Sequence, residues 1–383
     1  MITQICNEDQ CTGCFACMNG CFHNAIECGM DENGKIIPKI IEDACTECGL
    51  CKKICPVNSH IKKEKPHECY AAWTKDRKSR RIASSGGVAI EFSKYFIENH
   101  AVVYGSTFAG EFQLKHTRAE TYEEVERFCG SKYVQSYVGK SYRNVKKDLE
   151  SGKQVLFIGT PCQIAGLKAY LRNDYEKLLT VDLICHGTPP MQYLKEYVEE
   201  IVGKDKATEV SFRGKRDYRM MIYGGKKVLY SKRFRRDPYY VAFLQGLISR
   251  DNCYSCDYAD IKRCSDITIG DFWGIDRKSL SQSYNGKISV VLINTLKGKE
   301  MWKKMKGGLI YEKREISEAV AGNIPLRQSS NFSPDRKKFL DNYQKEDFIH
   351  AIITPKVEKE LERAKIEDDL LHRVVGKIRK ILK

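Results

Sequence analysis

Short apolar stretches alternate with amphipathic stretches from residue 70 to residue 293. The apolar stretches are typical of strands and the longer amphipathic ones of helices. This alternation predicts an α/β domain built on a mixed, partly parallel sheet. The predicted strands are 70–73, 101–108, 154–160, 179–185, 266–272 and 287–293, and the predicted helices cover about 87–99, 141–151 and 191–202.

The two ends of the chain follow other patterns. An Asn-Gly turn in "DENGKIIP" (31–38) predicts a hairpin, and the charged stretch 60–68 reads as a linker. Residues 356–383 read as a charged helix that docks on the protein or a partner, or lies on a membrane surface. We therefore expect an α+β domain over 1–65, an α/β domain over 66–330 and a C-terminal helical tail over 331–383. The apolar stripe of the last helix is Leu370, Leu371, Val374, Val375, Ile378, Ile381 and Leu382.

Composition fits a globular protein of two or three domains, with 383 residues, 42% of them apolar and 10% aromatic. No apolar run is long enough to predict a transmembrane segment, and the first residues do not resemble a secretion signal, so a cytoplasmic location is expected. In that compartment the 17 cysteines read as metal ligands rather than disulfides. The formal charge of +15 would suit nucleic acid, but no motif supports that alternative.

Eight cysteines form a repeat of the pattern C-x2-C-x2-C-x3-C. This spacing wraps three thiolates around one 4Fe–4S cluster and sends the fourth to the other cluster. Structural zinc is the alternative, although it would leave the third cysteine of each run without a role. The predicted ligand sets are Cys11, Cys14, Cys17 and Cys55 for one cluster, and Cys45, Cys48, Cys51 and Cys21 for the other. The remaining cysteines of this half and its surroundings, Cys6, Cys28, Cys69 and Cys129, are expected to be small buried apolar residues.

Later cysteines follow predicted strands. Cys162 and Cys185 stand at carboxyl ends of strands, where open α/β sheets bind ligands. Cys253 and Cys256 form a chelating pair, and Cys264 follows. The alternative is that the strand-end cysteines belong to the core and the pair binds zinc.

Six motifs in order carry a resemblance to a known family. They are "SSGG" (84–87), "GSKYVQS" (130–136), "GTPCQIAGL" (159–167), "LICHG" (183–187), "CYSC" (253–256) and "SDITIGDFWG" (265–274). Behind a dicluster ferredoxin, they resemble the coenzyme F420 hydrogenase/dehydrogenase beta subunit family over about residues 1–310. The resemblance implies FAD and a third 4Fe–4S cluster, with Cys162, Cys185, Cys253 and Cys256 as ligands and Cys264 in reserve.

The implied flavin site has candidates in two of these motifs. Ser84, Ser85, Gly86 and Gly87 form a turn before a predicted helix, where backbone amides favour an anion; an ordinary helix cap is the alternative reading. Lys132 and Tyr133 would add a cation and a ring. No Rossmann fingerprint is present. His186 either relays protons or caps its turn.

The stretch 210–237 holds ten Lys or Arg against two Asp. It reads as strands with a solvated basic face, or as a docking surface for an anionic substrate or acidic partner.

Taken with the resemblance, these features predict an iron–sulfur flavoprotein oxidoreductase that exchanges hydride at FAD and passes single electrons through its clusters. The partner would be a redox protein or a small electron donor or acceptor, and the resemblance allows coenzyme F420 or an enzyme of polysaccharide biosynthesis. The alternative is an electron-transfer subunit without substrate chemistry of its own.

Overall fold

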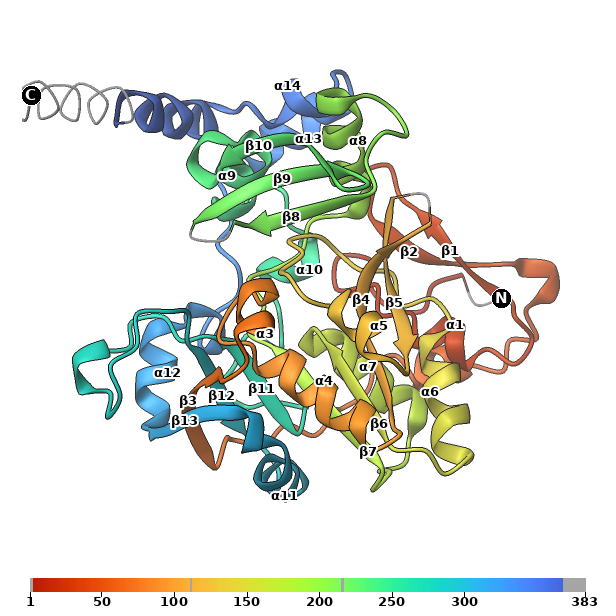
Figure 1. Ribbon diagram of the computed structural model, residues 1–383. Coiled ribbons are helices and arrows are strands. Elements are labelled where there is room, and N and C mark those ends of the chain that lie inside the picture. Colours follow the sequence, from red (N-terminus) through yellow and green to blue (C-terminus); the bar gives the residue numbers. More distant parts are fainter. Residues whose placement is uncertain (1–2, 111, 215–216, 368–383) are drawn as a thin grey trace, which may run out of the picture.

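The computed structural model describes residues 3–110, 112–214 and 217–367, and a mixed eight-stranded sheet forms its centre (Figure 1). Strands β4, β6, β7 and β11 run parallel, and the strands on either side of them pair antiparallel. The predicted mixed, partly parallel sheet is therefore confirmed. In spatial order the strands are β13 (Leu309–Arg314), β3 (Glu68–Thr74), β12 (Ser289–Ile293), β11 (Ile267–Asp271), β7 (Leu178–Leu183), β6 (Val155–Gly159), β4 (Val102–Ala109) and β5 (Gln113–Ala119).

Helices cover both faces of this sheet. Val103 packs with α4 (Val88–Glu98) and α11 (Leu296–Met305) on one face. Its neighbours Val102 and Tyr104 pack with α6 (Ser141–Glu150) and α7 (Pro161–Leu171) on the other. Successive residues of a strand point to opposite faces, and this explains why β6 (VLFIG) carries apolar residues on both faces.

The N-terminal segment packs beside α6 and α7. Strands β1 (Ile26–Met30) and β2 (Ile36–Ile40) form the predicted antiparallel hairpin. Short helices α1 (Ala16–Gly20) and α2 (Leu50–Lys53) lie within the two cysteine runs. Helix α1 contacts both α6 and α7, so this segment is docked on the α/β domain.

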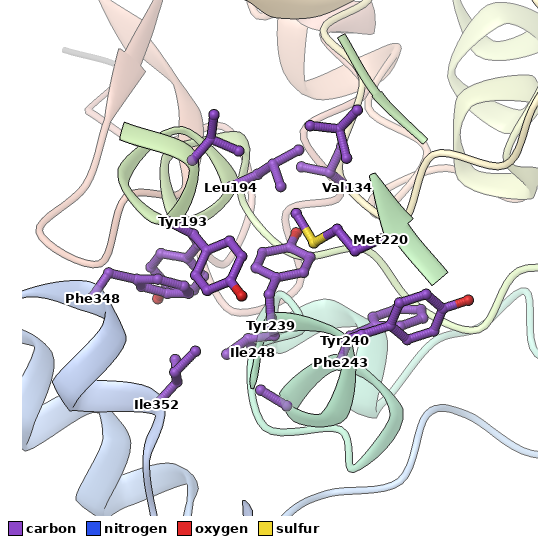
Figure 2. Packing of buried hydrophobic residues seen from close by; sticks show 14 of the residues in the cluster. Val134, Tyr193, Leu194, Met220, Tyr239, Tyr240, Phe243, Ile248, Phe348 and Ile352 are labelled. Atoms are coloured by element: carbon purple, nitrogen blue, oxygen red, sulfur yellow. The ribbon is translucent and has the colours of Figure 1, made fainter. Parts of the chain in front are cut away.

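A second, three-stranded sheet lies over one end of the large sheet (Figure 1). Its antiparallel strands β8 (Glu209–Arg213), β9 (Tyr218–Gly224) and β10 (Lys227–Arg233) fall within the stretch where strands are predicted. Aromatic side chains fill the core beneath it (Figure 2). The helices that contribute are α8 (Met191–Val202), α9 (Pro238–Leu244), α13 (Arg336–Tyr343) and α14 (Phe348–Ile352).

Shorter helices complete the described chain: α3 (Arg77–Ile82), α5 (Tyr122–Glu126), α10 (Asp251–Tyr254) and α12 (Ile316–Gly322). Residues 355–367 are helical, and the predicted stripe from Leu370 to Leu382 lies outside the described residues. Among the described helices, none combines the length and the hydrophobicity needed to cross a bilayer.

Candidate functional site

A cavity of about 590 Å³ opens at the carboxyl edge of the parallel strands. One wall is formed by Gly159 and Leu183, which end β6 and β7, and by the residues that follow them, Thr160 and Ile184 to Thr188. Gly270 and Asp271 of β11 form another. This size suits a cofactor or a small ligand, and this edge is where open α/β folds bind them.

The predicted Ser-Ser-Gly-Gly turn faces this cavity at the start of α4. Ser84, Ser85 and Gly87 line it, together with the first turn of the helix. Gly87 is the N-cap residue, with φ of 88°, and no described side chain caps the helix. Backbone N–H groups of the first turn are therefore available to an anion.

Gly86, the remaining residue of the turn, has a structural role. It does not line the cavity in the described chain. Its N–H donates to the Ser289 hydroxyl over 2.9 Å, and a Cβ at this position would lie 2.2 Å from the Ala72 carbonyl oxygen. The first glycine of the turn thus permits α4 to approach the sheet closely.

Lys132 and Tyr133 line the cavity as well. The Lys132 ammonium donates to the Phe128 and Cys129 carbonyl oxygens, each over 2.8 Å. Burial lowers its pKa to about 8, while the thiol of Cys129 and the carboxylate of Glu209 oppose this shift. This amine can lose its charge in the physiological range, and an anion beside it would hold the proton.

Arg213 and Asp271 are site residues that the sequence interpretation missed. The Arg213 side chain is 8% exposed and pairs with Asp271 over 2.7 Å. Its Nε donates to the Tyr133 hydroxyl over 3.0 Å, and its guanidinium lies 4.2 Å from the Tyr218 ring centroid. The remaining nitrogen, Nη1, is buried without a hydrogen-bond partner among the described residues. Because Arg213 lines the cavity, this nitrogen is an open position for an acceptor.

Two histidines also line the cavity. His186, which follows β7, is exposed as a residue, and desolvation of its ring by the surrounding atoms lowers its pKa. His116, which the sequence interpretation did not single out, is buried between the Ser136 hydroxyl and the Ile158 carbonyl. Burial lowers the His116 pKa to about 4, so this ring stays neutral at physiological pH.

Four later cysteines surround a second, smaller cavity. Cys162, Cys185, Cys253 and Cys256 all line it. Cys162 and Cys185 also line the large cavity, so the two spaces share a wall. Burial raises the pKa of Cys185, and the other three thiols raise it further because their charges would repel. The structure therefore brings together the four residues that the resemblance implies.

Hydrogen-bond donors point at these sulfurs. The N–H groups of Gly187 and Tyr258 donate to the sulfurs of Cys185 and Cys256. The Thr160 hydroxyl lies 3.1 Å from the Cys162 sulfur. Such donors stabilise thiolate ligands.

Cys264 stands apart from this group. Its thiol donates to the Pro161 carbonyl oxygen over 3.4 Å. Burial raises its pKa to about 12, and its next strongest charge neighbours are Asp182 and Arg263. This geometry favours a structural role for Cys264 over a role as a cluster ligand.

Among the eight cysteines of the repeat, the predicted set of Cys11, Cys14, Cys17 and Cys55 is buried. Burial raises the pKa of Cys17, and the charges of Cys14, Cys11 and Cys55 raise it further. Backbone N–H groups donate to each sulfur of this set. The crossed partner Cys55 thus lies with the first run, as the spacing predicts.

The other set is closer to the surface. Cys48 is exposed, while Cys45, Cys51 and Cys21 are half-buried. Burial raises the Cys51 pKa, and the charges of Cys48 and Cys21 add to the shift. The Ala25 N–H donates to the Cys21 sulfur over 3.3 Å. Cys21 thus lies with the second run, although Phe22 rather than proline follows it.

The buried set and the later group adjoin each other through α7. Cys14 is one of the charges that act on Cys162. Four residues after Cys162, Gly166 packs so closely on Cys14 that a Cβ would lie 2.9 Å from its sulfur. The buried N-terminal cysteines therefore lie close to Cys162, which lines the large cavity.

The four cysteines expected to be buried apolar residues have different surroundings. Cys69 is fully buried in the sheet core, and Cys129 is half-buried against it. The expectation is wrong for Cys28, which is exposed. It is also wrong for half-buried Cys6, whose thiol hydrogen-bonds to Cys11 and Cys55 and lowers their pKa values to about 6 and about 7.

Within the described ranges, no group of three or more His, Cys, Asp or Glu side chains converges as a site for a metal ion. The cysteine groups described above are defined by thiols that lie near one another and by the N–H and hydroxyl groups that donate hydrogen bonds to their sulfurs.

Comparison with known proteins gives two family matches. Residues 10–59 match the 4Fe-4S dicluster domain. Residues 152–319 match the model that describes the C terminus of the coenzyme F420 hydrogenase/dehydrogenase beta subunit. The first match covers both cysteine runs, and the second covers all four later cysteines.

The chain is similar to a curated protein and to a solved structure. The coenzyme F420-dependent sulfite reductase of Methanocaldococcus jannaschii is 26% identical over 195 residues, which are 49% of this chain and 29% of that protein. The chain thus spans under a third of this relative. A chain of the F420-reducing nickel–iron hydrogenase complex from Methanosarcina barkeri is 20% identical, with a TM-score of 0.47, over 80% of this chain and 92% of that one.

The chain thus joins a segment that matches a 4Fe-4S dicluster domain to an α/β domain that matches, over residues 152–319, the C terminus of the coenzyme F420 hydrogenase/dehydrogenase beta subunit.

Proposed function

We propose that the chain is an iron–sulfur flavoprotein oxidoreductase. In this proposal FAD occupies the large cavity and a third 4Fe–4S cluster occupies the smaller one. Hydride enters or leaves at the flavin, and single electrons travel between the flavin and a redox partner through three clusters. A cytoplasmic location fits the need to keep the cysteine ligands reduced.

The observation that carries the proposal is the shared wall. Cys162 and Cys185 line both cavities, so a cluster in one is next to a flavin in the other. Cys162 also adjoins Cys14 across α7. Side by side, these sites provide a continuous route for electrons.

The residues around the large cavity fit an anionic dinucleotide. The amides at the start of α4 and the Lys132 ammonium would hold phosphate, since both offer positive charge to an anion. Arg213 Nη1 offers a further unpaired donor. When bound, FAD supplies the conversion between one hydride, which carries two electrons, and two single electrons.

The residues around the smaller cavity fit a cluster. Four thiols gather there with N–H and hydroxyl donors aimed at them. We propose Cys162, Cys185, Cys253 and Cys256 as its ligands. For the two N-terminal clusters we propose the crossed sets of the sequence prediction.

The hydride partner that we propose is coenzyme F420, which the relatives' names include. A sugar-modifying reduction linked to polysaccharide biosynthesis is the competing substrate class. The two are separated by supplying each reductant or oxidant to the purified protein and following the visible spectrum.

Cofactor content is the decisive experiment. The protein is purified without oxygen, and iron, acid-labile sulfide and acid-released flavin are counted per chain. About twelve irons and one FAD are expected. About eight irons without flavin would support a simple electron-transfer subunit instead, and zinc in place of iron would end both proposals.

A further inference from the structure

Arg250 is a buried cation that the sequence analysis did not single out. Its side chain is only 1% exposed, and the residue immediately precedes α10, where Cys253 lies. Burying a charge is costly unless an opposite charge or several hydrogen bonds compensate it.

The hydrogen bonds of Arg250 go to neutral acceptors. Nη2 donates to the Cys11 carbonyl over 2.9 Å, and Nη1 donates to Gln135 Oε1 over 2.7 Å and to the Ile36 carbonyl over 3.2 Å. Nε donates to Asn252 Oδ1 over 3.2 Å. None of the carboxylates that the structure describes forms an ion pair with this guanidinium.

The nearest acidic residue in sequence is already neutralised. Asp251 pairs with Lys35 over 2.9 Å and with Arg336 over 2.5 Å. Lys35 has a second partner in Asp31 at 3.3 Å. Lys35 and Arg336 thus balance the charges of Asp31 and Asp251, and the charge of Arg250 remains uncompensated.

Thiols of two groups face this charge. Burial raises the pKa values of Cys162 and Cys253, and the positive charge of Arg250 opposes both shifts. On Cys11 the Cys6 hydrogen bond lowers the pKa first, and Arg250 lowers it further. The charge of Arg250 thus acts on the buried N-terminal set and on the later group at once.

The backbone of Arg250 is bonded beside the later cysteine group, while its side chain reaches the first cysteine run. Its carbonyl accepts from the Cys253 N–H over 3.0 Å, and its N–H donates to the Thr188 carbonyl over 3.1 Å. With the side chain bonded to the Cys11 carbonyl, this one residue connects two cysteine loops that are far apart in sequence. A thiolate-ligated four-iron cluster carries roughly two negative charges, so a cluster at either loop supplies the missing counter-charge.

We propose that Arg250 is a positioning residue whose buried charge raises the reduction potentials of the first N-terminal cluster and of the third cluster together. The part that concerns the third cluster rests on the proposed function; the part that concerns the first does not. A fixed positive charge favours the reduced, more negative form of a cluster, so electrons would reside on these two rather than on the outer cluster near Cys48.

The test is an anaerobic redox titration followed by electron paramagnetic resonance. Two variants cancel the uncompensated positive charge in different ways. Arg250→Gln removes the guanidinium, and Gln135→Glu places a carboxylate where the Gln135 amide oxygen now accepts a hydrogen bond from Arg250. In both, the reduced-to-oxidised ratio of the two clusters at fixed potential is expected to fall about tenfold, which is 59 mV for one electron. Arg250→Lys keeps the charge and is expected to stay within about threefold of the unmodified protein.

Arg143→Gln is the matched control. Its half-buried guanidinium also donates to carbonyl oxygens of a cysteine loop, those of Met18 and Cys21, but solvent screens it. The first and third clusters should keep their ratios within about threefold.

Unchanged ratios in Gln135→Glu with full iron content would overturn the proposal, as would a tenfold fall in Arg250→Lys. If the Arg250→Gln protein loses iron, Gln135→Glu and Arg250→Lys still test whether the charge of Arg250 sets the two reduction potentials. About eight irons in the unmodified protein would refute the third cluster, while the first cluster would still report on Arg250.

Discussion

Replacing Gly166 with alanine tests whether the dicluster segment depends on close packing against α7. The new Cβ would lie 2.8 Å from Cys14 Cβ, 2.9 Å from its sulfur and 2.9 Å from the Tyr142 hydroxyl. Tyr142 is fully buried and donates to the Gln163 carbonyl over 2.7 Å, so it has little room to move. The displacement therefore falls on Cys14.

The magnitude follows from two opposing effects. Overpacking a buried position costs about 1–3 kcal/mol, whereas alanine is about 1 kcal/mol better than glycine within a helix. Helix α7 itself should thus remain stable, while a strain of about 1.4 kcal/mol acts on the contact with Cys14. That strain corresponds to about a tenfold larger population with the Cys14 loop displaced.

The assay measures cluster loss and unfolding side by side. Iron release to a chelator is followed under anaerobic conditions, and thermal unfolding is recorded on the same preparation. About tenfold faster loss of the first cluster is expected, with a nearly unchanged unfolding temperature. Gly307→Ala is the control, because a Cβ there meets nothing within 4 Å. Iron release at the unmodified rate in Gly166→Ala would refute the packing argument.

Four other substitutions test separate parts of the site. Cys14→Ser should remove four irons and leave flavin bound, whereas Cys256→Ser should remove a different cluster and weaken flavin retention; unchanged iron in both would refute the ligand sets. Lys132, with a pKa lowered by burial to about 8, is charged below that pH and neutral above it, so flavin affinity should fall as pH rises through 8. Fluorescence titration measures this, and Lys132→Gln should remove the pH dependence. Arg213→Gln should lower the affinity for the anionic ligand of the cavity about tenfold, and equal affinity would exclude Nη1 as its donor.

The cysteine grouping and the sheet could be predicted because both depend on local patterns. The x3 spacing alone sends Cys21 and Cys55 to opposite runs, and apolar strands buried on both faces, such as β6, are continuous in sequence. Edge strands β5 and β13 were not predicted. Half of each faces outward, and Lys115 or Lys313 interrupts the apolar pattern.

The cations of the site were beyond prediction for a different reason. Arg250 lies 239 residues from Cys11 and Arg213 lies 58 residues from Asp271. No spacing rule connects such pairs, since only the fold brings them together. Arg213 also stands in a stretch that reads as strands with a solvated basic face. The contact of Cys6 with Cys11 and Cys55 was not predicted, because a single cysteine outside the repeat has no spacing that relates it to the others.

Two arginine contacts that dock the dicluster segment share one property. Arg143 donates to the Met18, Asn19 and Cys21 carbonyls, and Arg250 donates to the Cys11 carbonyl. Both cations come from the α/β domain, and both reach carbonyl oxygens of cysteine loops rather than carboxylates. Dipoles satisfy the hydrogen bonds of a guanidinium but do not cancel its charge. Solvent screens the half-buried Arg143, whereas the buried Arg250 has no such screening. Under the proposal made above, a cluster on the cysteines supplies the negative charge that Arg250 lacks, and loss of that cluster should therefore also weaken the docking of the segment.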